Sequence, residues 1–233
     1  VIAPGTAQSA ELITDAVAAG ADAVVAPAPF YVGTHPGEIA RHYRRLAEVA
    51  GEVPLVAYDI PPRVHTRLPA AVILELAADG VLAGIKDSSG DLPGLRTLLA
   101  GREVRGLTGL SILTGSEPTA DLAVALGVDG IIPGLGNVAV TPFVTILEAA
   151  RNGDLRAADA AQQQVLSLMP LFGVGDRRRI SDSSATTGAL KTALRLMGVI
   201  DAAVPAAPLT PLDDAETERV RAILVAAGML DDR

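Results

Sequence analysis

Short apolar runs alternate with longer segments of helical periodicity over the first two thirds of the chain. The run AVVAPAPF (23–30), for example, precedes PGEIARHYRRLAEVAG (36–51), where apolar residues recur every three or four positions. Consecutive apolar positions are typical of strands that are buried on both faces, and the periodic segments are typical of amphipathic helices. The pattern therefore predicts a series of strand–helix units.

Six such units are expected, and they favour a parallel sheet covered by helices, either doubly wound or closed into a barrel. Beyond about Gly153 the pattern becomes helical throughout, which predicts a strand–helix part over residues 1–152 and a helical extension over residues 153–233. A polar, glycine-containing stretch, GVGDRRRISDSS (173–184), predicts a mobile loop within the extension. The expected strands lie at 1–6, 23–30, 53–61, 81–88, 111–117 and 129–137, and the expected C-terminal helices at 155–172, 185–199 and 213–228.

Composition and charge limit the classes of function. With 233 residues and 49% hydrophobic content, the chain is long enough for one domain with a sizeable core. The net charge of -8 argues against nucleic acid or an anionic membrane surface as a partner, because both require a basic patch. No cysteine is present, which excludes a thiol nucleophile and fits a reducing cytoplasm. Neither a leader nor a membrane segment is evident, so we expect a soluble, cytoplasmic protein.

Lysine is rare in this chain, and one of the two lysines follows an apolar run. The chain has 19 lysines and arginines together, of which only Lys86 and Lys191 are lysines. Lys86 ends the run VLAGI and precedes DSSG. A lysine amine can attack a carbonyl once its pKa is shifted by burial, whereas arginine stays charged. Lys86 is therefore a candidate nucleophile, although a lysine that reaches solvent or pairs with Asp87 would fit the same decapeptide.

Polar residues collect where the expected strands end, which is where parallel sheets bind their ligands. Forming an imine requires an amine, a group that transfers protons and a group that binds the substrate carboxylate. Lys86, Tyr58 and Arg63 are of these three types, although Tyr58 could also be a core aromatic residue. The strand-end residues are Tyr31, Tyr58, Arg63, Lys86, Gly115, Ser116, Glu117 and the glycines of GIIPGLGN.

The ordered motifs YDIPPR, GIKDSSGD, LTGSE and GVDGIIPGLGNV resemble the dihydrodipicolinate synthase/N-acetylneuraminate lyase family. The resemblance extends over nearly the whole chain. It implies a (β/α)₈ TIM barrel with C-terminal helices, and a pyruvate-dependent class I aldolase. Catalysis would use no metal or organic cofactor, because the substrate would be held as a Schiff base on Lys86. The resemblance also implies a homo-oligomer, either a dimer or a tetramer.

Family roles can be carried over residue by residue. Lys86 matches the Schiff-base lysine, and Tyr58 matches the tyrosine that transfers protons. Arg63 matches an arginine that binds a substrate carboxylate, and Tyr31 matches a tyrosine that a neighbouring subunit contributes. The remaining candidates for substrate binding are Gly115 and Ile132, which match backbone positions of the pyruvate site, and Glu117, which matches acidic positions that bind sugar hydroxyls in lyases but could also cap a helix.

The chain also departs from the family pattern. Its first expected strand matches the third strand of the family, so about two of the eight units are expected to be absent from this sequence. Val64 and His65 replace a usual Thr-Gly pair, which leaves the second substrate open. Three functions follow: an aldolase or lyase acting on pyruvate and an aldehyde, a 2-keto-3-deoxy sugar-acid aldolase or dehydratase, or a non-catalytic member that only binds a keto acid or a protein partner.

Overall fold

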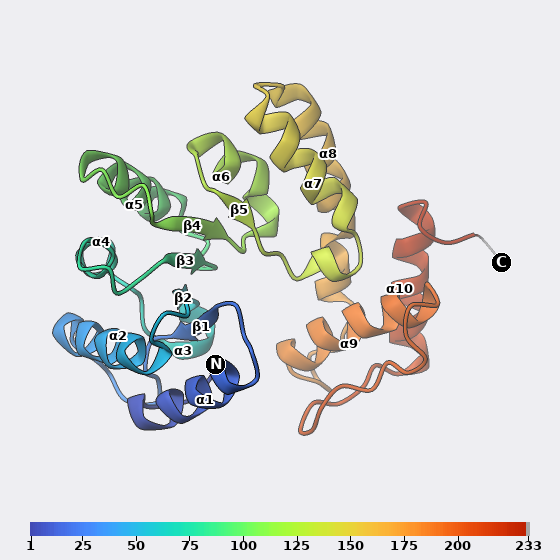
Figure 1. Cartoon of the computed structure of the whole chain (residues 1–233). Coiled ribbons are helices and arrows are strands. Elements are labelled where there is room, and N and C mark those ends of the chain that lie inside the picture. The colour runs from blue at the N-terminus through green and yellow to red at the C-terminus, as the bar shows by residue number, and fades with distance from the viewer. Residues whose placement is uncertain (232–233) are drawn as a thin grey trace. The chain divides into compact units, whose positions relative to one another are not determined.

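The computed structural model describes residues 1–231 and divides into two compact units. The first unit comprises residues 1–116 and 122–132, and the second comprises residues 117–121 and those from Pro133 onward. These units are defined by compactness, whereas the expected boundary at residue 152 separates a strand–helix part from a helical extension by sequence pattern. That boundary stays a prediction. Figure 1 shows the chain coloured along its length.

The first unit is built on a parallel sheet whose strands follow one another in chain order. Residue pairs such as Ala57 and Ile85, or Ile85 and Ile112, lie opposite each other in register. Parallel neighbours require crossover connections, and helices supply them here. Within residues 1–231 the strands of this sheet are β1 (Val24–Pro27), β2 (Leu55–Asp59), β3 (Gly84–Asp87), β4 (Ser111–Thr114) and β5 (Gly130–Ile131).

The strand expected over residues 1–6 is not formed, so the described residues contain five strands and not six. Helix α1 already begins at Thr6, with Gly5 as its N-cap. The preceding residues make single contacts: the Val1 amino group donates to the Val25 carbonyl at 2.8 Å, and the Pro4 carbonyl accepts from the Phe30 amide at 3.2 Å. Pro4 has no N–H to donate to a strand ladder, and α1 begins only two residues later. The segment before the helix therefore does not pair as a strand.

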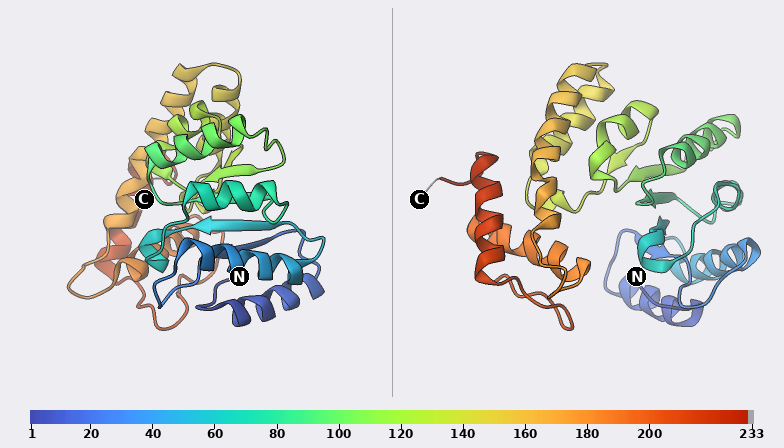
Figure 2. Two further views of the ribbon diagram at one scale, coloured as in Figure 1. Left: turned by 90° about the vertical axis from the view of Figure 1, so that its left-hand side faces the viewer. Right: turned by 180° about the vertical axis from the view of Figure 1, so that it is seen from behind.

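Helices cover one face of the sheet (Figures 1 and 2). In α2, His35 and Glu38 form a capping box, and the fully buried Tyr43 donates its hydroxyl to the Ala26 carbonyl at 3.0 Å. Strand residues alternate between the faces, so Ile85 packs under the helices while its neighbours in sequence face the other way. The helices of this unit include α1 (Thr6–Ala18), α2 (Pro36–Ala50), α3 (Pro61–Val64), α4 (Ala70–Ala78) and α5 (Leu92–Val104), and α6 (Ala120–Leu126) spans both units.

The second unit is helical, as the periodicity of the C-terminal third predicted. Each of the three expected C-terminal helices is present, and Asp154, Ser181 and Asp213 cap them at their N-termini through side-chain oxygens. The elements are η1 (Glu117–Thr119), η2 (Leu135–Asn137), α7 (Val140–Arg151), α8 (Leu155–Leu168), η3 (Met169–Gly173), α9 (Asp182–Leu196) and α10 (Asp214–Ala226).

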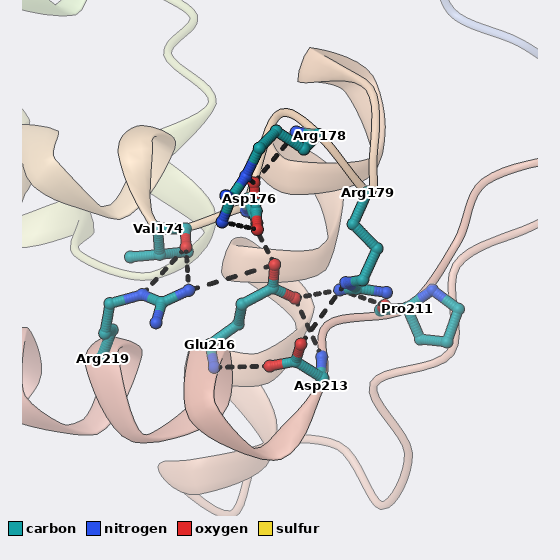
Figure 3. A network of polar contacts seen from close by, with 8 residues as sticks. All are labelled: Val174, Asp176, Arg178, Arg179, Pro211, Asp213, Glu216 and Arg219. Atoms are coloured by element: carbon teal, nitrogen blue, oxygen red, sulfur yellow. Dashed lines mark hydrogen bonds and ion pairs between the residues drawn. The ribbon is translucent and has the colours of Figure 1, made fainter.

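A buried carboxylate in α10 connects this helix to the polar loop before α9 (Figure 3). Glu216 is fully buried, and it accepts hydrogen bonds from the amides of Asp176 at 2.7 Å and Asp213 at 2.9 Å. Arg179 forms an ion pair with the same carboxylate. Burial acts to raise the pKa of Glu216, but the two amides and Arg179 outweigh it, and the pKa is lowered. The carboxylate therefore stays charged inside the unit.

None of the helices in the described part of the chain combines the length and the apolar character needed to cross a membrane.

Candidate active site

Lys86 and Tyr58 lie side by side on neighbouring strands. The two residues are opposite each other in the register of β2 and β3, and both side chains are half-buried. The Lys86 Nζ atom lies 4.6 Å from the centroid of the Tyr58 ring. This is within the range of a cation–π contact, which holds the amine over the aromatic face. The structure thus places the predicted nucleophile in contact with the predicted proton-transfer residue.

Gly115 leaves room beside this pair. A Cβ atom at this position would clash with the Ser88 Oγ atom and lie 3.1 Å from the Lys86 Cε atom. The Gly115 amide donates to the Asp87 carbonyl at 2.8 Å, which fixes the close approach of this backbone. A glycine suits this position, because an added Cβ atom would make the Ser88 hydroxyl move and would press against the Lys86 side chain.

Ser88 was not among the predicted site residues, although the sequence contains a signal for it. Ser88 follows Lys86 by two positions, and side chains two apart in a strand point to the same face. The alternation continues one residue beyond β3, so the Ser88 hydroxyl and the Lys86 side chain share the space over Gly115. The hydroxyl adds a hydrogen-bonding group next to the amine.

Replacing Gly115 by alanine is expected to lower turnover about 10- to 100-fold, since the added methyl group would displace Lys86 or Ser88 from reactive geometry. The matched control is Gly109→Ala in the same unit, because a Cβ atom at Gly109 meets nothing within 4 Å. Steady-state rates of both variants, with thermal melting to confirm folding, test this. Equal rates for the two variants would show that Gly115 has no special role.

The other predicted residues of the first unit lie at or beyond strand ends. Arg63 is an exposed residue in the last turn of the short helix α3, which directly follows β2. Tyr31 follows β1, is 96% exposed and has a φ of 82°, in the left-handed region that non-glycine residues rarely adopt. Ile132 follows β5, and its amide donates to the Thr114 carbonyl at 2.7 Å. Their roles in substrate binding stay predictions.

Glu117 belongs to the second unit and contacts backbone amides there. Its Oε1 atom accepts from the Gly134 amide at 2.7 Å and from the Leu135 amide at 3.4 Å. Both amides lie at the start of η2, in the sequence GLGN. The Glu117 carboxylate thus caps the start of η2, which is the alternative role that the sequence allowed for it. Because the carboxylate occupies these two amides, they are not open to bind a phosphate group.

No group of three or more His, Asp or Glu side chains within residues 1–231 is placed to hold a metal ion.

Comparison with known proteins identifies the relatives of this chain. The Dihydrodipicolinate synthetase family matches residues 1–227. A 4-hydroxy-tetrahydrodipicolinate synthase of Chlorobium limicola is 31% identical over 226 residues, which cover 97% of this chain and 71% of the relative. An uncharacterised DapA-like lyase of Halobacterium salinarum is 32% identical over 228 residues, which cover 98% of this chain and 70% of the relative.

Solved structures of dihydrodipicolinate synthases also resemble this chain. The dihydrodipicolinate synthase of Acinetobacter baumannii, solved with pyruvate, has a TM-score of 0.82 and 28% identity, and the match covers 97% of this chain and 73% of the other. The enzyme from Bacteroides thetaiotaomicron has a TM-score of 0.86 and 26% identity, with the same coverage.

These likenesses first define the class, which is that of lyases with a (β/α)₈-barrel fold. Within that class, the chain belongs to the dihydrodipicolinate synthetase family.

Proposed function

We propose that this protein is a Schiff-base lyase or aldolase that forms or cleaves a carbon–carbon bond between pyruvate, or another 2-oxo acid, and an aldehyde. The observation that carries the proposal is the contact between Lys86 and Tyr58 in a chain of this family. An amine on a strand end, next to a phenol and open space above a glycine, is suited to attack on a small ketone.

The chemistry assigns a separate step to each group. The neutral amine of Lys86 adds to the keto carbon of pyruvate, and loss of water from this adduct gives an imine. Loss of a proton from the methyl carbon gives an enamine, which attacks the aldehyde carbon, and water then releases the product and frees the lysine. Tyr58 would transfer protons during addition and loss of water, and Arg63 would bind a carboxylate of the substrate.

The second substrate is not fixed by these residues. The aldehyde site in this proposal lies near Arg63 and the altered pair Val64-His65, where His65 ends α3 in the left-handed conformation. A sugar-acid aldolase or dehydratase would use the same imine, but the contacts of Glu117 with backbone amides give that alternative no added support.

Assembly and location complete the proposal. We infer a homo-oligomer, either a dimer or a tetramer, supported by the exposure of the adjacent residues Tyr31 (96%) and Val32 (61%). A cytoplasmic location is supported by the absence of cysteine from the sequence.

Reduction with borohydride in the presence of pyruvate is expected to leave a carboxyethyl group on Lys86. The imine forms with loss of water, and borohydride supplies the hydride that makes the new carbon–nitrogen bond permanent. Because the chain has only two lysines, peptide mass mapping distinguishes Lys86 from Lys191 without ambiguity. Omitting pyruvate is the control. Modification of Lys191 alone, or of both lysines equally, would contradict the assignment.

A further inference from the structure

Two buried carboxylates lie directly behind the Lys86–Tyr58 pair, on the helix-covered face of the sheet. Asp59 follows Tyr58 and Asp87 follows Lys86, and the two aspartates are opposite each other in register. Both are almost fully buried, with 3% and 8% exposure. They line a cavity of about 350 Å³ at the start of α4 and α5. Burying two like charges side by side is costly unless a cation compensates for them.

Arg67 supplies a cation to Asp59 and connects it to a third carboxylate, Asp91. Its Nε atom donates to the Asp59 carboxylate at 3.1 Å, and its Nη1 atom donates to the Asp91 carboxylate at 3.1 Å. Asp59 also accepts from the Leu68 amide at 3.1 Å, and Asp91 caps α5 through the Gly94 amide at 3.0 Å. Arg67 thus connects the end of β2 to the start of α5, which follows β3. Arginine suits this role because its planar group can bind two carboxylates in fixed directions.

Asp59 and Asp87 also hold the strand ends through their backbone carbonyls. The Ser88 amide donates to the Asp59 carbonyl at 2.8 Å, and the Gly115 amide donates to the Asp87 carbonyl at 2.8 Å. These hydrogen bonds continue the sheet just beyond Tyr58 and Lys86, towards the serine and glycine that surround the amine. A shift of Asp59 would therefore move the residues on both sides of the site.

We propose that Arg67 is a positioning residue: by bridging Asp59 and Asp91 it clamps the ends of β2 and β3 from behind, and so fixes Lys86 against Tyr58. The role in catalysis rests on the proposed function, but the clamp itself does not. Arg67 contacts neither Lys86 nor Tyr58 in any described hydrogen bond or ion pair within residues 1–231, so it acts through the strands.

The electrostatic balance at Asp59 fits this role. Burial raises the pKa of Asp59 and the neighbouring Asp87 raises it further, while the Leu68 amide and Arg67 lower it, with a net increase. Loss of Arg67 would remove a lowering contribution and favour the neutral acid. A protonated Asp59 would bind the start of α4 less strongly, because its hydrogen bond from the Leu68 amide would no longer be charge-assisted.

The test compares Arg67→Ala with Arg44→Ala. Arg44 in α2 also bridges two carboxylates, Glu75 and Asp79, but on the exposed surface of the helix layer. Hydrogen exchange should become about tenfold faster at the Ser88 and Gly115 amides in Arg67→Ala, the scale of losing one hydrogen bond to a charged group. In Arg44→Ala the two amides should keep their wild-type exchange rates.

A second readout reports on the nucleophile and needs no activity. Reductive methylation labels both lysines, so Lys191 is an internal standard for the reactivity of Lys86. The ratio of Lys86 to Lys191 labelling should rise in Arg67→Ala and stay constant in Arg44→Ala. Should Arg67→Ala fail to fold, Asp91→Asn replaces it, because asparagine keeps the cap of α5 and removes only the charge.

The outcomes are distinct. Faster exchange with a raised Lys86 to Lys191 labelling ratio supports the clamp, and kcat with pyruvate should then fall about 10- to 100-fold, as for a small displacement of catalytic groups. A lower melting temperature with wild-type exchange at both amides and a wild-type labelling ratio would overturn it. If the wild-type chain forms no adduct with pyruvate, the proposed function fails, while exchange and labelling still decide on the clamp.

Discussion

Lys86→Arg is expected to abolish turnover, with a loss of about 10⁴-fold or more, the scale seen when a covalent nucleophile is removed. Arginine keeps the positive charge and can still lie over the Tyr58 ring, but its guanidinium group does not lose a proton to become a nucleophile. The measurement is the steady-state rate with pyruvate and an aldehyde, together with adduct formation under borohydride.

Lys191→Arg is the matched control, because it makes the same substitution in α9 of the second unit. It should leave the rate unchanged and keep the adduct on Lys86. Residual turnover in Lys86→Arg within tenfold of wild type would remove the imine from the mechanism, since the variant offers no amine at that position.

Tyr58→Phe is expected to lower turnover about 10²-fold, the usual contribution of a general acid or base. The phenyl ring keeps its place beside Lys86 and only the hydroxyl is lost, so folding should be unaffected. The rate must be measured where chemistry, and not product release, limits turnover.

Tyr43→Phe is the matched control, because it removes a tyrosine hydroxyl that has a structural and not a catalytic role. The Tyr43 hydroxyl is fully buried and donates to the Ala26 carbonyl, so its removal should lower the free energy of unfolding by about 1 kcal/mol. The rate per folded molecule should stay near wild type. Equal rate losses in the two variants would mean that Tyr58 acts only on stability.

The sheet was predictable to the extent that its signals are local. The runs 23–30, 53–61, 81–88 and 111–117 contain strands, and consecutive apolar residues of this kind are typical of strands in parallel sheets. The run 1–6 carries a similar signal but also Pro4 and Gly5, and proximity to the start of α1 decided against a strand. The ends of the strands were less predictable than their existence. A strand was expected over residues 129–137, for example, but β5 comprises only Gly130–Ile131.

The structure brings Lys86 and Tyr58 together, while the roles of the candidate site residues stay predictions and the contacts that support the pair could not be read from the sequence. Lys86 and Tyr58 each end an apolar run, and that local fact suggested their roles. Arg67 stands in a polar loop, and its importance arises from Asp59 and Asp91 in two other segments, which no local pattern brings together. Glu117 likewise meets the amides of GLGN only in the folded chain.

The burial of Glu216 has a consequence for how this sequence can change over generations. A carboxylate enclosed by its own unit tolerates the loss of Arg179 poorly, because the cation that would remain, Arg219, lies 4.0 Å away at the other carboxylate oxygen. An apolar pair in their place could be tolerated, whereas either single change would be selected against. Among descendants of this chain, positions 179 and 216 should therefore be inherited as a pair, both charged or both neutral.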